Sequence, residues 1–133
     1  MLLPVLRLPL RDSDAYDAAY ANAARLHAAG VRFAIVTDSV SDARSLPYHA
    51  AMARAFGLPA GEALRAITLS PAEILGLGAR LGSLAPGKDA DVVVATGDVM
   101  DIRSQVTRVF VAGREQSLET RHTRLFEKFR ARP

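Results

Sequence analysis

Residues 79–98 read ARLGSLAPGKDADVVVATGD, and this stretch decides how the chain is organised. Pro86-Gly87 precedes a cluster of charged residues that ends at Asp91 and leads directly into three valines. Proline and glycine favour turns, whereas a run of β-branched residues favours a strand. The stretch therefore predicts a turn-rich crossing that leads into a short apolar strand over 91–95.

The composition is that of an ordinary globular domain. The 133 residues are 50% hydrophobic and 23% charged, which is typical of a chain that buries a core. The absence of cysteine excludes disulfides and thiolate metal ligands and suits a reducing compartment, so we expect a cytoplasmic protein. The net charge is only +3, and no apolar run approaches the roughly 18 residues of a membrane span. We therefore expect neither a nucleic-acid partner nor a membrane partner.

Upstream of residue 78, strand and helix patterns alternate. Residues 31–37 (VRFAIVT) are an apolar, β-branched run, typical of a strand buried on both faces in a parallel sheet. Residues 3–10 alternate more loosely, and their two prolines restrict them to a sheet edge. This alternation is typical of an α/β fold. The helical patterns run from Ser13 to Gly30, from Tyr48 to Gly57, over 59–68 and over 70–76.

Two of these helices carry signals for an N-terminal cap. Ser13 or Asp14 is placed to cap the first helix. In SPAEILG, the segment over 70–76, Ser70 is predicted to be the N-cap, with Glu73 completing a capping box and Gly76 ending the helix.

Downstream of residue 78 the pattern changes to turns and short strands, predicted at 91–95 and 106–112, and then to an amphipathic helix in the tail. We therefore divide the chain into two segments, 1–77 and 78–133. The basic face of the tail helix is interpreted as solvated, with contact to an acidic partner as the alternative. Its apolar residues available for packing are Leu118, Leu125, Phe126 and Phe129, and its basic residues are Arg121, Arg124, Lys128 and Arg130.

Asp38 is the first candidate for chemistry, because it directly follows the predicted buried strand. In α/β barrels, side chains at the carboxyl ends of the strands converge on one rim, where a carboxylate can bind a metal or accept a proton. Aspartate is equally common in turns, where it satisfies backbone amides. Asp42 and Arg44, in the same polar loop, are candidates for substrate binding, with solvation or ion pairing as the alternative. His49 either contacts metal or substrate or makes a local hydrogen bond.

No other residues form a complete catalytic or metal-binding set. Ser39 and Ser41 lack a neighbouring base and a Gly-x-Ser-x-Gly elbow, which argues against a serine nucleophile. The three histidines are far apart, and neither His-x-His nor His-x-x-x-His occurs. We therefore expect that the chain alone does not bind a transition metal tightly.

Three stretches carry a family resemblance that covers about residues 15–130. They are GVRFAIVTDS (30–39), LPYHAAMARAFGLPAGEALRAITLSPAEILGLGARLGSLAPGKDADVVV (46–94) and VTRVFVAGRE (106–115). In this order they closely resemble the carboxyl-terminal part of metal-dependent amidohydrolases, and most of all the imidazolonepropionase-like members. The segment EALRAITLSPAEILGL, followed by LGSLAPGKDADVVV, is the most specific part of the match.

The resemblance implies the C-terminal part of a (β/α)8 metal-dependent hydrolase barrel, followed by strands of a small β-sandwich and a C-terminal helix. Residues 1–77 would then be a partial barrel segment, and 78–133 would supply the composite sandwich. Within the first segment, 31–37 would be the eighth barrel strand and 48–76 the helices that close the barrel. The opening stretch, 79–98, would be the crossing from barrel to sandwich.

The resemblance also implies a role for the strand-end aspartate. The family places an aspartate at the end of the eighth strand, where it binds a divalent metal, here expected to be zinc, and manages the proton of the attacking water. Asp38 occupies that position, although the loop length also allows a shifted register with Ser39 or Asp42 there. His49 is not one of the usual family ligands and is left as support for a substrate loop.

The implied activity is hydrolysis of carbon–nitrogen bonds other than peptide bonds, in cyclic amides or similar small molecules, by metal-activated water. The family's His-x-His, its bridging lysine or glutamate and its later histidines have no counterpart in this sequence. We therefore expect a C-terminal part of an amidohydrolase that is inactive alone and requires its missing N-terminal part or a homo-oligomer. The alternative is a non-catalytic protein-interaction domain derived from the same fold.

Overall fold

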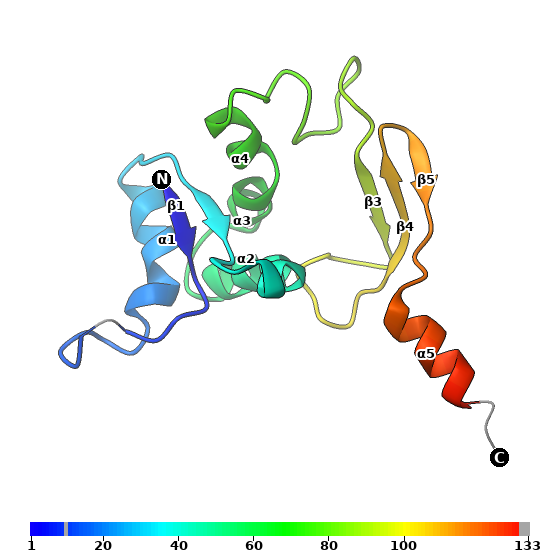
Figure 1. Ribbon diagram of the computed structural model, residues 1–133. Coiled ribbons are helices and arrows are strands. Elements are labelled where there is room, and N and C mark those ends of the chain that lie inside the picture. Colours follow the sequence, from blue (N-terminus) through cyan, green and yellow to red (C-terminus); the bar gives the residue numbers. More distant parts are fainter. Residues whose placement is uncertain (10, 131–133) are drawn as a thin grey trace.

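The computed structural model describes residues 1–9 and 11–130 and has an α/β architecture (Figure 1). A two-stranded parallel sheet packs with four helices in the first part of the chain. A three-stranded antiparallel sheet and a last helix follow. The α/β class predicted from the sequence is confirmed, together with the small antiparallel sheet and the C-terminal helix.

The parallel sheet pairs β1 (Leu2–Pro4) with β2 (Ala34–Val36). Helix α1 (Ala18–Ala28) lies in the crossover connection that parallel pairing requires. Two of the three β2 residues are buried, which confirms a buried parallel strand within 31–37. Both strands are shorter than predicted, and residue 10, the end of the predicted first strand, lies outside the described residues.

Helix α1 begins later than predicted, at Ala18 rather than near Ser13. Asp14 does not cap it, because the Asp14 carboxylate accepts the backbone N–H of Arg11 at 3.1 Å in a turn that precedes the helix. The predicted end is confirmed, since Gly30 takes a left-handed φ of +69° just beyond the last turn.

Three helices follow β2 and confirm the three predicted after it. They are α2 (Leu46–Ala55), preceded by the 3₁₀ helix η1 (Val40–Ser45), then α3 (Ala60–Ile67) and α4 (Leu69–Ile74). Helix α2 begins two residues earlier than predicted, with Pro47 in its first turn, where proline loses no hydrogen bond.

The capping box predicted for α4 is wrong. The helix begins at Leu69, so Ser70 lies inside its first turn, and no side chain caps it. Glu73 instead binds the guanidinium of Arg65 in α3 through both carboxylate oxygens, at 2.9 and 3.0 Å. The local sequence pattern could not show that Arg65, in the preceding helix, competes for the Glu73 carboxylate. Gly76, with a φ of +74°, ends the segment as predicted.

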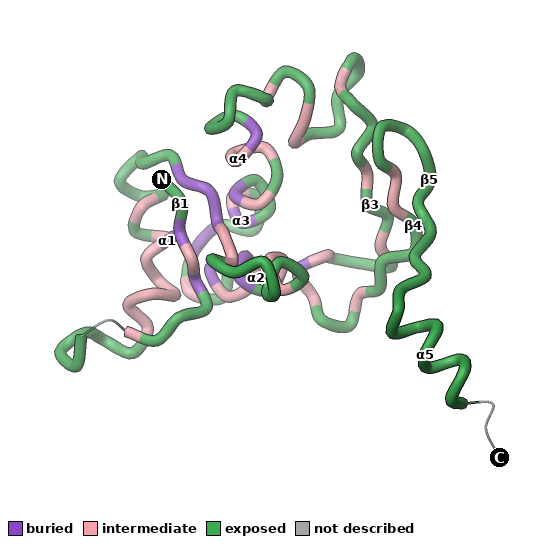
Figure 2. Tube along the Cα trace, in the orientation of Figure 1, coloured by how far each residue is buried: buried purple, intermediate pink, exposed green. Residues whose placement is uncertain are grey.

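The hydrophobic core lies between the parallel sheet and helices α1, α2 and α3 (Figure 2). Many of its members are alanines, whose small side chains let helices approach closely. The members of this core from the first part of the chain are Leu3, Val5, Ala23, Phe33, Ile35, Ala50, Ala53, Leu58, Ala63 and Ala66.

The antiparallel sheet comprises β3 (Val92–Ala95), β4 (Val106–Val111) and β5 (Arg114–Gln116). The first two confirm predicted strands. The third was not predicted, because it is three residues long and polar. A tight turn at Ala112-Gly113, with φ values of +49° and +74°, joins β4 to β5 in the geometry that suits a two-residue hairpin.

The crossing that precedes β3 is held by its own charged residues. Lys88 Nζ donates to the Gly78 carbonyl at 2.5 Å and to the Ser83 hydroxyl at 2.7 Å. The Arg80 guanidinium pairs with the Asp89 carboxylate at 2.7 Å. The turn-rich crossing predicted from the sequence is therefore an ordered loop, which is stabilised by the hydrogen bonds of Lys88 and by the Arg80–Asp89 ion pair.

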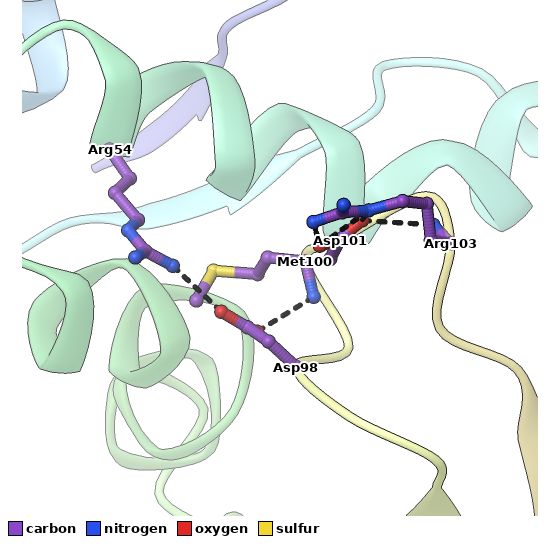
Figure 3. Close-up of polar contacts among 5 residues, drawn as sticks. All are labelled: Arg54, Asp98, Met100, Asp101 and Arg103. Carbon is purple, nitrogen blue, oxygen red and sulfur yellow. Dashed lines mark hydrogen bonds and ion pairs between the residues drawn. The ribbon is translucent and has the colours of Figure 1, made fainter.

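A second loop, between β3 and β4, fastens the antiparallel sheet to the helical core (Figure 3). Its Met100 is 8% exposed and packs in that core. Asp98 accepts the backbone N–H of Met100 at 2.9 Å and the guanidinium of Arg54 in α2 at 2.7 Å. The neighbouring pair, Asp101 and Arg103 at 2.6 Å, stays within the loop. No sequence motif pointed to this connection.

Helix α5 (Arg121–Arg130) extends away from the antiparallel sheet and is exposed along its whole length (Figure 1, Figure 2). The apolar residues predicted to be available for packing remain accessible: Leu125, Phe126 and Phe129 are 38%, 61% and 49% exposed. Within residues 1–9 and 11–130, no helix combines the length and the apolar character needed to cross a bilayer.

Candidate active site

The carboxyl ends of β1 and β2 lie side by side because the two strands are parallel. The chain beyond β1 reaches Arg7, and the chain beyond β2 reaches Asp38. The Arg7 guanidinium forms an ion pair with the Asp38 carboxylate, and the two side chains keep 46% and 51% of their surface exposed. This pair marks the rim where the sequence placed its first candidate for chemistry.

The backbone at Asp38 is left-handed, with a φ of +65°. This conformation is uncommon for a residue other than glycine, and aspartate is among those that tolerate it. Beside it, the Thr37 hydroxyl donates to the Ser39 carbonyl at 3.0 Å, which closes a tight turn. The turn takes the chain sharply out of β2 and leaves the Asp38 side chain at the strand end.

His49, in the first half of α2, is buried and only 4% exposed. Its Nδ1 accepts the backbone N–H groups of Val5 and Leu6, each at 3.3 Å. The proton of the neutral ring therefore sits on Nε2. Burial lowers the pKa of His49, and the nearby Asp42 carboxylate opposes that shift.

The local hydrogen bond expected for His49 is in fact a long-range one, to Val5, which is 44 positions earlier. It joins α2 to the segment that leaves β1, directly before Arg7. His49 therefore fixes the backbone that carries the arginine to Asp38.

Asp42 and Arg44 lie exposed in η1. The Asp42 backbone N–H donates to the Ser39 carbonyl at 3.2 Å, and the Ser39 and Ser41 hydroxyls share a hydrogen bond of 2.7 Å. The charge of Asp42 thus acts on His49, and His49 is linked to Asp38 through the backbone that leaves β1 and through Arg7.

The rim fits one ligand of a divalent metal rather than a whole coordination sphere. A carboxylate oxygen, as Asp38 offers, is a common zinc ligand and suits harder cations as well. Within the described part of the chain, no group of three or more His, Cys, Asp or Glu side chains could hold a metal ion. Asp38, Asp42 and His49 are therefore not gathered into one cluster.

Two surface hollows lie beside the helices. One, of about 290 Å³, is lined by residues of β1 and α1 and includes Arg7 and Asp14. The other, of about 230 Å³, includes the Arg65–Glu73 pair. Asp38 lines neither hollow, so its carboxylate lies on an open surface of this chain.

Sequence reasoning missed Arg7 as a partner of the candidate carboxylate. The available signal was indirect: a basic residue three positions after a strand that pairs in parallel with β2 reaches the same edge of the sheet. A pattern that alternates only loosely did not define where β1 ends, so the position of Arg7 could not be derived.

Known proteins share this arrangement of elements. The model of the amidohydrolase family matches residues 10–115. The amidohydrolase tasK of Hapsidospora irregularis is 32% identical over 105 residues, which make up 78% of this chain and 11% of tasK. The solved amidohydrolase from Thermotoga maritima MSB8 aligns with a TM-score of 0.70 and 34% identity, over 79% of this chain and 28% of that one. An adenosine deaminase from Xanthomonas campestris with bound zinc aligns with a TM-score of 0.59 and 29% identity, over 83% and 32%.

The chain belongs to the amidohydrolase family. This confirms the family resemblance found in the sequence, whereas the particular likeness to imidazolonepropionase-like members stays a prediction. The chain spans less than a third of the length of each of these three relatives.

Proposed function

We propose that this chain supplies Asp38 as the metal-binding and proton-accepting carboxylate of an amidohydrolase. The proposed reaction is hydrolysis of non-peptide carbon–nitrogen bonds in cyclic amides or similar small molecules. One observation carries the proposal: within the family match, Asp38 follows a buried parallel strand and lies at the carboxyl end of the sheet. The absence of cysteine suits the cytoplasm as the compartment.

We assign residues 1–77 to the closing part of a (β/α)8 barrel and residues 78–133 to sandwich strands and a C-terminal helix. The parallel pair β1 and β2, with α1 between them in sequence, supports the barrel assignment. The antiparallel order β3-β4-β5 supports the sandwich assignment. In this arrangement β2 is the eighth barrel strand, and α2 to α4 close the barrel.

Zinc is the proposed metal, in keeping with the zinc bound in the Xanthomonas campestris relative. Bound at the rim, it would lower the pKa of a water molecule and polarise the substrate carbonyl. Asp38 contributes one oxygen ligand, and the remaining ligands come from residues beyond these 133 or from a second copy of the chain. The isolated chain is then inactive and binds metal weakly.

Within this chain, the Asp38 carboxylate would accept the proton of the attacking water and return it to the nitrogen that leaves as the carbon–nitrogen bond breaks. Arg7 neutralises and holds this carboxylate when no other cation is present, and His49 positions Arg7 through the backbone of Val5 and Leu6. Asp42 and Arg44 are proposed to face the substrate from η1, since both are exposed on the loop that follows Asp38.

The assignment of Asp38 is tested by titrating the chain with Mn²⁺ and recording paramagnetic broadening of backbone amide signals by NMR. Broadening is expected to centre on Asp38 and its two neighbours, and Asp38→Asn removes it. Asp91→Asn, which changes an aspartate of the crossing, is the matched control and leaves it unchanged. Broadening centred on Asp42 would instead establish the shifted register of the loop.

The role of Arg7 is tested in the same titration. Arg7→Gln removes the competing cation, so the same broadening is expected at lower Mn²⁺ concentration. Arg11→Gln, four residues further along the same segment, is the control and changes nothing. A hydrolysis assay on cyclic amides completes the test, because robust turnover by the purified chain alone contradicts the proposed division of the site.

A further inference from the structure

Helix α5 concentrates the positive charge of the protein. Residues 1–120 contain 12 of the 17 basic and 13 of the 14 acidic residues, a balance of −1. Residues 121–133 contain five basic residues and one acidic residue, a balance of +4. The net charge of +3 is therefore a property of the C-terminal end of the chain.

The helix also has a largely apolar face. With 3.6 residues per turn, Leu125, Phe126 and Phe129 fall on one side, which they share with His122. All three are exposed, and α5 contains no buried residue. A row of basic residues, Arg121, Arg124 and Lys128, borders this face on one flank, and Arg130 borders it on the other.

The cations lie at the border of the apolar face and over its rings. Lys128 Nζ is 5.9 Å from the centroid of Phe129, and the Arg130 guanidinium carbon is 5.5 Å from that of Phe126. Glu127, the one acidic residue of α5, pairs with Arg130 at 2.8 Å. Long basic side chains beside aromatic rings can bury their stems with the rings and keep their charged ends at a polar boundary.

The apolar residues of α5 differ from the other exposed apolar side chains in their position relative to the region that matches the family. Exposed residues such as Leu84 and Val93 lie inside the region that matches the amidohydrolase family, where further parts of the fold would cover them. The match ends at residue 115, before α5 begins at Arg121. The family fold therefore does not specify what covers the apolar face of α5.

We propose that α5 is an interfacial helix that docks the protein onto an anionic lipid surface. Its apolar face enters the boundary between headgroups and acyl chains, and its basic flanks meet the negatively charged headgroups. This proposal departs from the sequence-based expectation of no membrane partner, which rested on the absence of a spanning segment, because α5 would lie on a membrane rather than cross it.

The arrangement favours lipid over the two other occupants of such a helix. Nucleic acid would draw the basic residues to the centre of the contact face, whereas here they flank an apolar centre. A second copy of the chain would offer a surface with a balance of only −1 over residues 1–120, which attracts the basic flanks weakly.

The test is co-sedimentation of the 133-residue chain with vesicles made of equal parts phosphatidylglycerol and phosphatidylcholine, and with vesicles of phosphatidylcholine alone. Partitioning onto the anionic vesicles is expected to be at least about tenfold stronger and to weaken as salt is added. Because α5 has no buried residue, its variants should keep the thermal melt of the parent chain.

Two matched pairs of variants separate the apolar and the charged contributions. Phe126→Ser combined with Phe129→Ser is expected to weaken partitioning about tenfold or more. Leu84→Ser combined with Ile102→Ser, at positions 83% and 77% exposed elsewhere, should leave it unchanged. Arg124→Gln is expected to weaken it about fivefold. Arg114→Gln in β5 should have no effect.

Equal binding to both kinds of vesicle, or an equal loss in the control pair, overturns the proposal. Retention on duplex DNA that survives the double Phe substitution, without vesicle binding, assigns α5 to nucleic acid instead. Self-association that the double Phe substitution abolishes, again without vesicle binding, assigns it to a second copy of the chain.

Discussion

The N-terminal segment (residues 1–77) and the C-terminal segment (residues 78–133) are held together by different means. Nearly all the buried apolar side chains of the described residues lie in the N-terminal segment, around β1, β2 and three helices. The sheet of the C-terminal segment is largely exposed on both faces, and its strands depend on backbone pairing (Figure 2). Among the described residues of the C-terminal segment, Met100 is buried in the core and Val99 packs against it.

This difference indicates where stability resides. Burying apolar surface is the largest favourable term in folding, and a short exposed sheet gains little from it. We therefore expect a substitution to lower the free energy of unfolding most where the side chain is buried in the core of the N-terminal segment.

The largest effect is expected at Leu58, which follows α2 and is 2% exposed. Leu58→Ala leaves a cavity among packed helices and should lower the free energy of unfolding by roughly 3 kcal/mol. Val93→Ala in β3, at a position 54% exposed, is the matched control and should cost well under about 1 kcal/mol. Urea unfolding followed by circular dichroism measures both. Equal losses of unfolding free energy would mean that side-chain burial contributes as much to stability in the C-terminal segment as in the N-terminal one.

The next effect is expected at Met100, which joins the two segments. Met100→Ala should lower the free energy of unfolding by roughly 2 kcal/mol, because truncating this buried side chain leaves a cavity in the core. Hydrogen exchange should rise more in β3 and β4 than in α2 and α3, since the sheet loses its anchor. Ile102→Ala, at an exposed position two residues further on, provides the control. Uniformly faster exchange across both segments would show that Met100 supports the core without fastening the sheet.

The same contrast explains what could be predicted from the sequence. Strands were predicted correctly where the sequence is strongly β-branched or periodic, as in residues 31–37 and 106–112. Local signals failed where a distant partner competed. Glu73 matched the capping-box pattern, yet Arg65 of another helix binds it. Asp14 matched an N-cap, yet a preceding turn uses its carboxylate.

The candidate site shows the same limit. Asp38 could be placed at a strand end because the strand itself was evident. Arg7 and the long-range hydrogen bonds of His49 depend on which strands pair, and they join residues 31 and 44 positions apart. No local pattern encodes contacts of that separation.

His49 gives a prediction about pH. Burial lowers its pKa, so between the ordinary histidine value of about 6.5 and the lower folded value the unfolded chain binds the proton more readily. This contribution to stability is full above about pH 6.5 and is lost as the pH falls towards the folded pKa, at no more than about 1.4 kcal/mol per pH unit. His49→Asn keeps an acceptor near Nδ1 and removes the titration, so it should flatten this slope.

Urea unfolding at a series of pH values measures the effect of His49. A pH slope that persists unchanged in His49→Asn would place the titrating group outside the link between α2 and the β1 exit.

The smallest effects are expected from two aspartate–arginine pairs on one loop, of which only Asp98–Arg54 joins the two segments (Figure 3). Asp98→Asn removes the charge paired with Arg54 of α2 and should lower the free energy of unfolding by about 0.5 kcal/mol, since both side chains are partly exposed. Arg103 holds the pKa of Asp101 at about 2 through hydrogen bonds to its carboxylate.

Because Asp101 and Arg103 are two residues apart, the unfolded chain can keep their contact, and folding gains little from it. Arg103→Gln should therefore raise the pKa of Asp101 towards its usual value, measured by NMR titration, and leave the unfolding midpoint unchanged. A shift of the unfolding midpoint as large as that of Asp98→Asn would show that a pair confined to the loop stabilises the fold as much as the pair that fastens the sheet to the core.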